Sequence, residues 1–190
     1  MKILITGAGG KLGSYLTQNL KGEVIGLTRQ QLDIIDKQMV KTAVEFHQPD
    51  LIINCAVLDH EESIKDPVRA YEVNVEGLRN LLGSGPKVLH ISSSVVYDPR
   101  DTYGLTKIVA ENIVDLKKHL ILRLPPFRYN KKKFVSDILI EKIPAIIEQI
   151  AGHTGLFCTW DLKRGWVKTK LINLLKRIWF RLERPSLKRE

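Results

Sequence analysis

A glycine-rich turn directly after the first apolar run constrains the fold of this chain more than any other feature. Residues 2–6 are mostly apolar, residues 7–13 read Gly-Ala-Gly-Gly-Lys-Leu-Gly, and helical periodicity starts at residue 11. Glycines at such a junction allow a tight turn, a close approach of backbone to phosphate, and close packing of helix on sheet. Any βα turn can use glycine, but the complete strand, turn and helix predict dinucleotide binding. The residues expected to hold the pyrophosphate are Gly7, Gly10, Lys11, Leu12 and Gly13.

Short apolar runs alternate with helix-period segments over about the first 125 residues. Most of the runs are continuously apolar, as expected for parallel strands that are buried on both faces. Strands are predicted over 2–6, 23–28, 51–54, 88–92 and 120–124, and helices over 11–20, 37–46, 67–82 and 106–116. This order predicts an α/β fold, a Rossmann-like doubly wound parallel sheet in residues 1–128. Ligands of such a sheet bind at the carboxyl ends of its strands.

The surplus of positive charge lies entirely in the last third of the chain. The net charge is +9, yet residues 1–127 carry 15 basic and 15 acidic side chains. Residues 129–190 are predicted to form a reduced substrate lobe with a basic amphipathic C-terminal helix. Two interpretations of this helix stay open: it packs on the core, or it makes a weak contact with an anionic membrane surface or a partner. No recognised motif predicts specific binding to nucleic acid.

The two cysteines indicate neither a disulfide framework nor a metal site. Cys55 and Cys158 lie far apart and no CxxC pair is present, which fits a reducing compartment. The run before the glycine turn is too short for a signal peptide, and no apolar run approaches the length of a bilayer span. We therefore expect a cytoplasmic protein.

The end of the second predicted strand bears on the choice of nicotinamide cofactor. An acidic residue at this point would bind a ribose 2′-hydroxyl, but the chain has Thr28 followed by Arg29. An arginine there tolerates a 2′-phosphate better, so NADP(H) is favoured over NAD(H). The alternative, that Arg29 is an ordinary solvated loop residue, stays open.

A serine run and a Tyr-x-x-x-Lys motif follow the fourth predicted strand. Residues 92–94 are all serine, and Tyr103 and Lys107 stand four residues apart, which puts them on one face of a helix. A phenol beside an ammonium group has its pKa lowered, and it can then exchange a proton with a substrate oxygen. A serine hydroxyl from the neighbouring strand end can hold the same oxygen. After a glycine-turn βαβ unit, this set indicates an oxidoreductase.

At this point the chain resembles the extended short-chain dehydrogenases/reductases, most closely their dTDP-4-dehydrorhamnose reductase branch. The resemblance runs from Met1 to about Arg128 and rests on residues 6–13, 32–36, 49–56, 70–74, 92–97 and 103–107. It implies NAD(P)H-dependent reduction of the keto group of a nucleotide-activated sugar, in dTDP-rhamnose biosynthesis.

The resemblance also implies a role for each matching residue. Ser93 would orient the sugar carbonyl, Tyr103 would be the general acid, and Lys107 would hold the nicotinamide ribose and lower the pKa of the tyrosine. Asp33 and Ile34 would border the adenine, and Cys55 and Ala56 would line the cofactor. An alternative role for Asp33 is to cap a turn. The side chain of Asn74, in the middle of a predicted helix, is expected to tie that helix to a neighbouring strand.

Several departures from the family pattern concern the sugar side of the site. Ser94 and Val95 replace an aspartate and a tyrosine, and Leu58 stands where a threonine is expected. The connection from Ser93 to Tyr103 is shorter than usual, and the chain stops where the family continues into its substrate lobe. The rival hypotheses are therefore a non-catalytic dinucleotide-binding regulatory or scaffold protein, and a related epimerase or dehydratase. A homodimer stays an open expectation.

Overall fold

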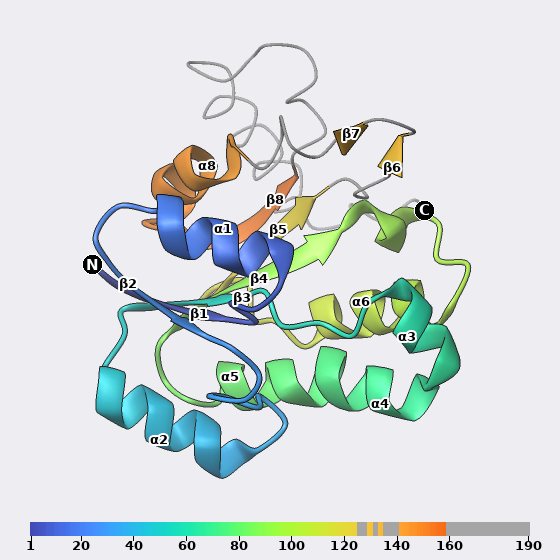
Figure 1. Ribbon diagram of the computed structural model, residues 1–190, viewed down its shortest axis with the longest axis horizontal. Helices are drawn as coiled ribbons and strands as arrows, with labels where there is room; N and C mark the ends of the chain where they lie inside the picture. The colour runs from blue at the N-terminus through green and yellow to red at the C-terminus, as the bar shows by residue number, and fades with distance from the viewer. Residues whose placement is uncertain (125–128, 131–132, 135–140, 159–190) are drawn as a thin grey trace, which may run out of the picture.

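A six-stranded, entirely parallel sheet forms the centre of the molecule (Figure 1). The computed structural model describes residues 1–124, 129–130, 133–134 and 141–158. The strands are β1 (Lys2–Thr6), β2 (Glu23–Leu27), β3 (Leu51–Asn54), β4 (Lys87–Ser93), β5 (Leu120–Leu124) and β8 (Gly155–Cys158), in the order β2-β1-β3-β4-β5-β8. The predicted Rossmann-like sheet is confirmed, and the reversal of strand order beside β1 is where such sheets bind ligands.

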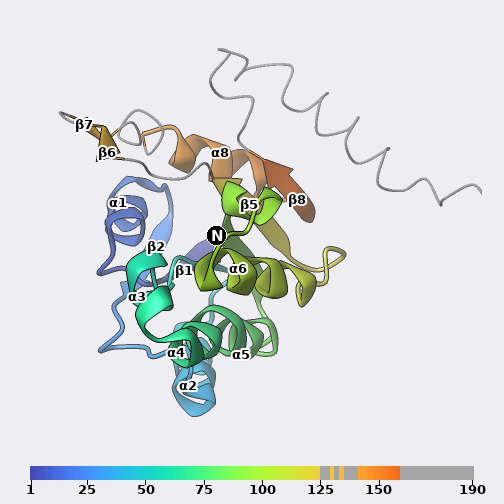
Figure 2. The ribbon, with the colours of Figure 1, turned by 90° about the vertical axis from the view of Figure 1, so that its right-hand side faces the viewer.

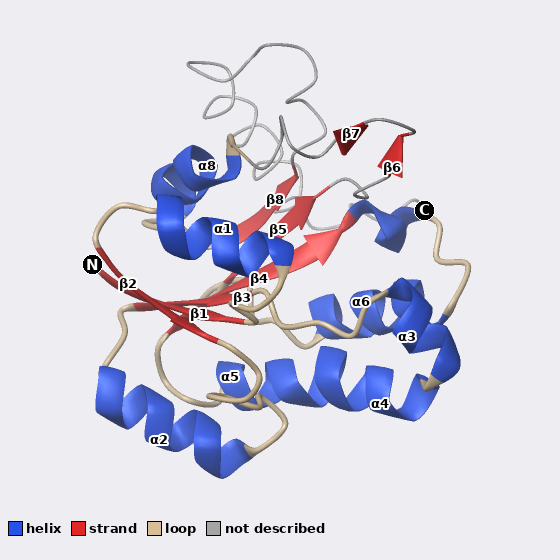
Figure 3. Ribbon diagram, viewed as in Figure 1, coloured by secondary structure: helices blue, strands red, loops and turns tan. Residues whose placement is uncertain are grey.

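Helices cover both faces of the sheet (Figure 3). One face carries α1 (Lys11–Asn19) and α8 (Ile143–Ile150), as Figure 2 shows from the side. The other carries the remaining helices: α2 (Lys37–His47), α3 (His60–Lys65), α4 (Pro67–Tyr71), the π-helical η1 (Glu72–Gly77), α5 (Leu78–Leu82) and α6 (Thr102–Asn112). A 3₁₀ turn, η2 (Ser94–Tyr97), follows β4, and β6 (Tyr129–Asn130) and β7 (Lys133–Phe134) form a small antiparallel pair.

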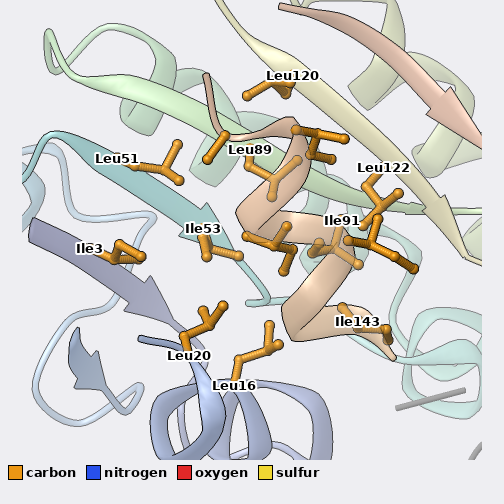
Figure 4. Close-up of a cluster of buried hydrophobic side chains, with 14 of the residues drawn as sticks. Ile3, Leu16, Leu20, Leu51, Ile53, Leu89, Ile91, Leu120, Leu122 and Ile143 are labelled. Carbon is orange, nitrogen blue, oxygen red and sulfur yellow. The ribbon is translucent and has the colours of Figure 1, made fainter. Parts of the chain in front are cut away.

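Alternate residues of the strands supply the two halves of the core. On the α1 and α8 face, Ile53 and Ile91 pack with Leu16 and Ile143 (Figure 4). On the opposite face, Ile52 and its neighbours pack against α2, α5 and α6. Because both faces are covered, the strands contain few polar positions, which explains the continuous apolar runs in the sequence.

Up to β5, the predicted elements agree with the structure except in the segment 67–82, at the unpredicted α3, and in the bounds of the helix predicted over 106–116, which is α6 and ends at Asn112. The segment predicted as one helix over 67–82 is α4, η1 and α5 in direct succession, and the short α3 was not predicted. The helix predicted from residue 106 begins at Thr102, because the side chain of Asp101 caps it by accepting the N–H of Gly104 at 2.9 Å. A glycine in the first turn weakens the helical pattern in the sequence, and the cap at Asp101 stabilises that turn in the structure.

Residues 143–158 extend the sheet, although the sequence places them in the appended lobe. Pro144 interrupts the apolar pattern, but it lies at the start of α8, where proline is well tolerated. Strand β8 then pairs with β5 in parallel register, from Leu120 opposite Gly155 to Arg123 opposite Cys158. Strand β8 begins with a glycine and follows a glycine-rich loop, so it leaves only a weak strand signal in the sequence.

The C-terminal basic helix predicted within 166–183 lies outside the residues that the structure describes. The boundary between the sheet domain and an appended lobe therefore stays a prediction. Within the described ranges, no helix is long and apolar enough to cross a membrane. The same ranges contain no group of histidine, cysteine and acidic side chains that could hold a metal ion.

Candidate active site

The glycine turn lies against the end of β3, and its geometry requires glycine. Gly7 has a φ of +67°, in the left-handed region that other residues rarely adopt. A Cβ atom on Gly7 would lie 2.7 Å from the backbone nitrogen of Ala56 and 2.8 Å from the carbonyl carbon of Cys55. The predicted cofactor residues Cys55 and Ala56 are therefore in direct contact with the predicted phosphate turn.

The N-terminus of α1 points out of this turn without a side-chain cap. Gly10 occupies the N-cap position in an extended conformation, and its N–H donates to the carbonyl oxygen of Gly7 at 3.0 Å. A Cβ atom on Gly13 would lie 2.3 Å from the same carbonyl oxygen, so only glycine lets α1 pack this close to the turn. Lys11 and Leu12 lie in the first helical turn. Backbone N–H groups and the helix dipole make this end suited to phosphate groups.

A buried asparagine fixes the end of β3 beside the turn. The amide oxygen of Asn54 accepts the hydroxyl of Thr6 at 2.8 Å and the backbone N–H of Ala56 at 3.2 Å. These bonds join the carboxyl ends of β1 and β3, which are neighbours in the sheet. Burial raises the pKa of the Cys55 thiol to about 12, so this thiol stays neutral and serves as an apolar wall.

The adenosine side of the predicted site is built around Asp33. Its carboxylate accepts the N–H of Ile35 at 3.2 Å and pairs with Arg29 at 3.7 Å and with Arg69 at 3.4 Å. Arg69, on α4, was not singled out from the sequence, and only the fold brings it to Asp33. The side chain of Ile34 is 2% exposed, so this residue contributes to the core with its side chain.

The structure brings Ser93, Tyr103 and Lys107 together at the carboxyl end of β4. Ser93 ends this strand, and its side chain is hydrogen-bonded to the phenol of Tyr103. The buried ammonium nitrogen of Lys107 donates to the carbonyl oxygen of Ile91 at 2.9 Å and lies 5.9 Å from the centre of the Tyr103 ring. This arrangement can hold and protonate an oxygen atom next to the glycine turn.

The pKa values of this set differ from the sequence-based expectation. Burial, together with the carboxylates of Asp59 and Asp101, raises the pKa of Tyr103 to about 12, against the opposing effect of the hydrogen bond from Ser93. Burial also lowers the pKa of Lys107 to about 8, although Glu111 opposes this shift. The phenol is therefore fully protonated near neutral pH, which suits a proton donor.

A second layer of polar side chains holds α6 on the sheet. Glu111, one turn after Lys107, accepts the hydroxyl of Ser92 at 2.6 Å and the Nε of Arg123 at 2.8 Å. Arg123 also donates to the hydroxyl of Tyr97 at 3.0 Å, which anchors the shortened connection after β4 to β5. The four-residue spacing of Tyr103, Lys107 and Glu111 indicates that Glu111 lies on the same helix face, which is the face that meets Ser92. The pairing of Glu111 with Arg123 has no signal in the sequence and depends on the fold.

Asn74 joins α6 to the loop after β3. Its amide nitrogen donates to the hydroxyl of Thr106 at 3.0 Å, and its amide oxygen accepts the backbone N–H of Leu58 at 2.8 Å. The predicted tie is thus made to a loop and to a helix, not to a strand. It places the residues before α3 next to the first turns of α6.

The chain is similar in sequence to several known proteins. The family described as RmlD substrate binding domain matches residues 1–142. The spore coat polysaccharide biosynthesis protein SpsK of Bacillus subtilis (strain 168) is 31% identical over 88% of this chain and 69% of its own length. The dTDP-4-dehydrorhamnose reductase of Aggregatibacter actinomycetemcomitans is 36% identical over 80% of this chain and 63% of its own length. The chain thus spans roughly two thirds of these relatives.

The fold also agrees with solved structures. The crystal structure of dTDP-4-dehydrorhamnose reductase from Bacillus anthracis, in complex with NADP, superposes with a TM-score of 0.71. The match covers 83% of this chain and 74% of that one at 22% sequence identity.

Proposed function

Because the chain belongs to the RmlD substrate binding domain family, we propose that it reduces the keto group of a nucleotide-activated sugar with NADP(H). The observation that carries this proposal is the convergence of Ser93, Tyr103 and Lys107 at the carboxyl end of β4. The 36% identical dTDP-4-dehydrorhamnose reductase supports the same substrate class.

The described residues fit a nicotinamide dinucleotide. The glycine turn and the uncapped end of α1 would hold the pyrophosphate, and Cys55 and Ala56 would border it along β3. Arg29 and Asp33 lie at the end of β2, where the adenosine ribose of a Rossmann cofactor is held. Arg29, with 68% of its side chain exposed, is able to reach a 2′-phosphate, which favours NADP(H). When bound, this cofactor supplies the hydride for the reduction.

The chemistry assigned to the chain itself is proton donation to the carbonyl oxygen. Tyr103 would give its hydroxyl proton to this oxygen, which Ser93 orients by a hydrogen bond. Lys107, held by the carbonyl oxygen of Ile91, would bind the ribose and stabilise the phenolate that forms. A non-catalytic dinucleotide-binding role is less well supported, because it gives no reason for Ser93, Tyr103 and Lys107 to lie together.

The direct test is a turnover assay with a panel of dTDP- and UDP-activated 4-keto sugars. We expect NADPH oxidation with at least one of them, and a lower KM for NADPH than for NADH. The control is the same panel with Lys107→Met, which removes the charged group from the site. If the wild type oxidises NADPH with no sugar in the panel, the reductase proposal is wrong.

Activity should also fall as pH rises through about 8. Burial lowers the pKa of Lys107 to about 8, so its ammonium group is present below that value and is lost above it. The phenol of Tyr103 stays protonated far above this range, so it does not mask the effect. We expect kcat/KM to decrease about tenfold for each pH unit above 8. A profile that is flat from pH 7 to about 9.5 would show that the charge of Lys107 is not needed.

A further inference from the structure

A short contact between a histidine and a carboxylate joins α3 to the helix that carries Tyr103. The Nε2 atom of His60, the first residue of α3, lies 2.6 Å from the Oδ2 atom of Asp101. Asp101 is the N-cap of α6, and Tyr103 lies in the first turn of that helix. Neither His60 nor Asp101 belongs to the three residues to which the reductase chemistry is assigned.

Asp101 uses both of its carboxylate oxygens, each for a different partner. The Oδ1 atom accepts the N–H of Gly104 at 2.9 Å, and the Oδ2 atom binds His60. The backbone carbonyl of Asp101 also accepts the N–H of Leu105 at 3.0 Å. The carboxylate that starts the catalytic helix is thus tethered to a second helix, which restricts the rotation of the first turn.

Tyr103 lies between the charged groups of these two helices. The rings of His60 and Tyr103 meet edge to face, with centroids 6.3 Å apart. Asp59 from α3 and Asp101 from the start of α6 act on the phenol electrostatically, and Lys107 approaches its ring from one turn further along α6. The His60 side chain is 58% exposed, so the pair lies at the solvent side of the phenol.

We propose that His60 is a positioning residue for the reaction: through Asp101, it fixes the first turn of α6 and thereby the direction of the Tyr103 hydroxyl. This inference rests on the proposed reductase function. His60 acts through Asp101 because its Nε2 atom is engaged there and no hydrogen bond joins it to the phenol in the described residues. A displacement of the hydroxyl by about 1 Å costs roughly 10²-fold in rate, so a single tether of this kind matters.

Two substitutions separate the hydrogen bond from the ring. His60→Phe keeps an aromatic edge against Tyr103 but cannot bind Asp101, whereas His60→Gln keeps an N–H donor and loses the ring. We expect His60→Phe to lower kcat by roughly 10- to 100-fold, with the KM for NADPH unchanged, and His60→Gln to stay within about threefold of the wild type. His47→Phe, on the distant helix α2, is the matched control.

Amide hydrogen exchange gives a readout that needs no substrate. We expect His60→Phe to accelerate exchange at Gly104 and Leu105, while His60→Gln and His47→Phe leave it unchanged. The positioning role is overturned if His60→Phe keeps both the wild-type kcat and the wild-type exchange, or if His60→Gln is as impaired as His60→Phe. If the wild type reduces no sugar, the proposed function fails separately, and the exchange measurement still decides whether His60 fixes the helix.

Discussion

Tyr103→Phe is expected to lower kcat for the reduction of a keto sugar by at least about 10²-fold, the usual contribution of a general acid. The substitution removes only the hydroxyl group and keeps the ring that packs against His60. Ser93 then has no phenol to bind, and no other described side chain is assigned the proton transfer. The affinity for NADPH should stay close to that of the wild type, because Lys107 keeps its hydrogen bond to Ile91. Steady-state kinetics and calorimetry measure the two effects.

A matched variant tests whether the loss is specific to this phenol. Tyr71→Phe removes the same hydroxyl from a tyrosine on α4 that is 43% exposed, and it should leave kcat unchanged. If Tyr103→Phe retains the full rate while NADPH binding is intact, another group supplies the proton, and the assignment of Tyr103 is wrong.

Gly10→Asp is expected to weaken NADPH binding by at least about 100-fold without unfolding the protein. Gly10 has φ −81° and ψ 164°, an extended conformation that aspartate adopts readily at an N-cap. The new carboxylate would therefore cap α1 and occupy the place of the cofactor phosphates. A like charge so close to a phosphate costs several kcal/mol, and each 1.4 kcal/mol, approximately, is a factor of ten in affinity.

Gly10→Asn separates charge from bulk in this experiment. Asparagine caps a helix about as well as aspartate and has nearly the same shape, but it carries no charge. We expect its NADPH affinity to lie between that of the wild type and that of Gly10→Asp. Both variants should melt close to the wild-type temperature, because the gain from the cap is offset by the contact of a Cβ atom at residue 10 with the carbonyl oxygen of Gly7, 3.3 Å away. A folded Gly10→Asp protein that binds NADPH as tightly as the wild type would disprove phosphate binding at this turn.

The parts of the fold that could be predicted are those whose signals are local. Strands β1, β3, β4 and β5 are almost entirely buried, so each leaves a largely apolar run in the sequence, and the partly exposed edge strand β2 is apolar after Glu23. Strand β8 is short and follows a glycine-rich loop, so its place beside β5 depends on pairing that no local pattern records. The sequence predicted a helix that begins at residue 106, after the true start of α6, because Gly104 weakens the helical pattern and the cap at Asp101 is a side-chain contact.

The candidate site also combines features that the sequence predicts with contacts that only the fold creates. The order of strand, glycine turn and helix, the serine run, and the four-residue spacing of Tyr103 and Lys107 are properties of the sequence itself. They predict the proposed reacting groups because backbone geometry converts these spacings into positions. The contacts of Asp33 with Arg69 and of Glu111 with Arg123 join different elements, and only the packing of the helices on the sheet creates them.

The clearest difference concerns the proton affinity of Tyr103. Its spacing from Lys107 predicts a lowered pKa, whereas the structure raises the pKa to about 12. Spacing along one helix determines which residues are neighbours, but the burial of the phenol and the approach of Asp59, the N-cap of α3, depend on tertiary packing. The sequence by itself therefore determined which groups are brought together in the candidate site. The tertiary structure decided how strongly Tyr103 holds its proton, because desolvation and charges from a separate helix act through space.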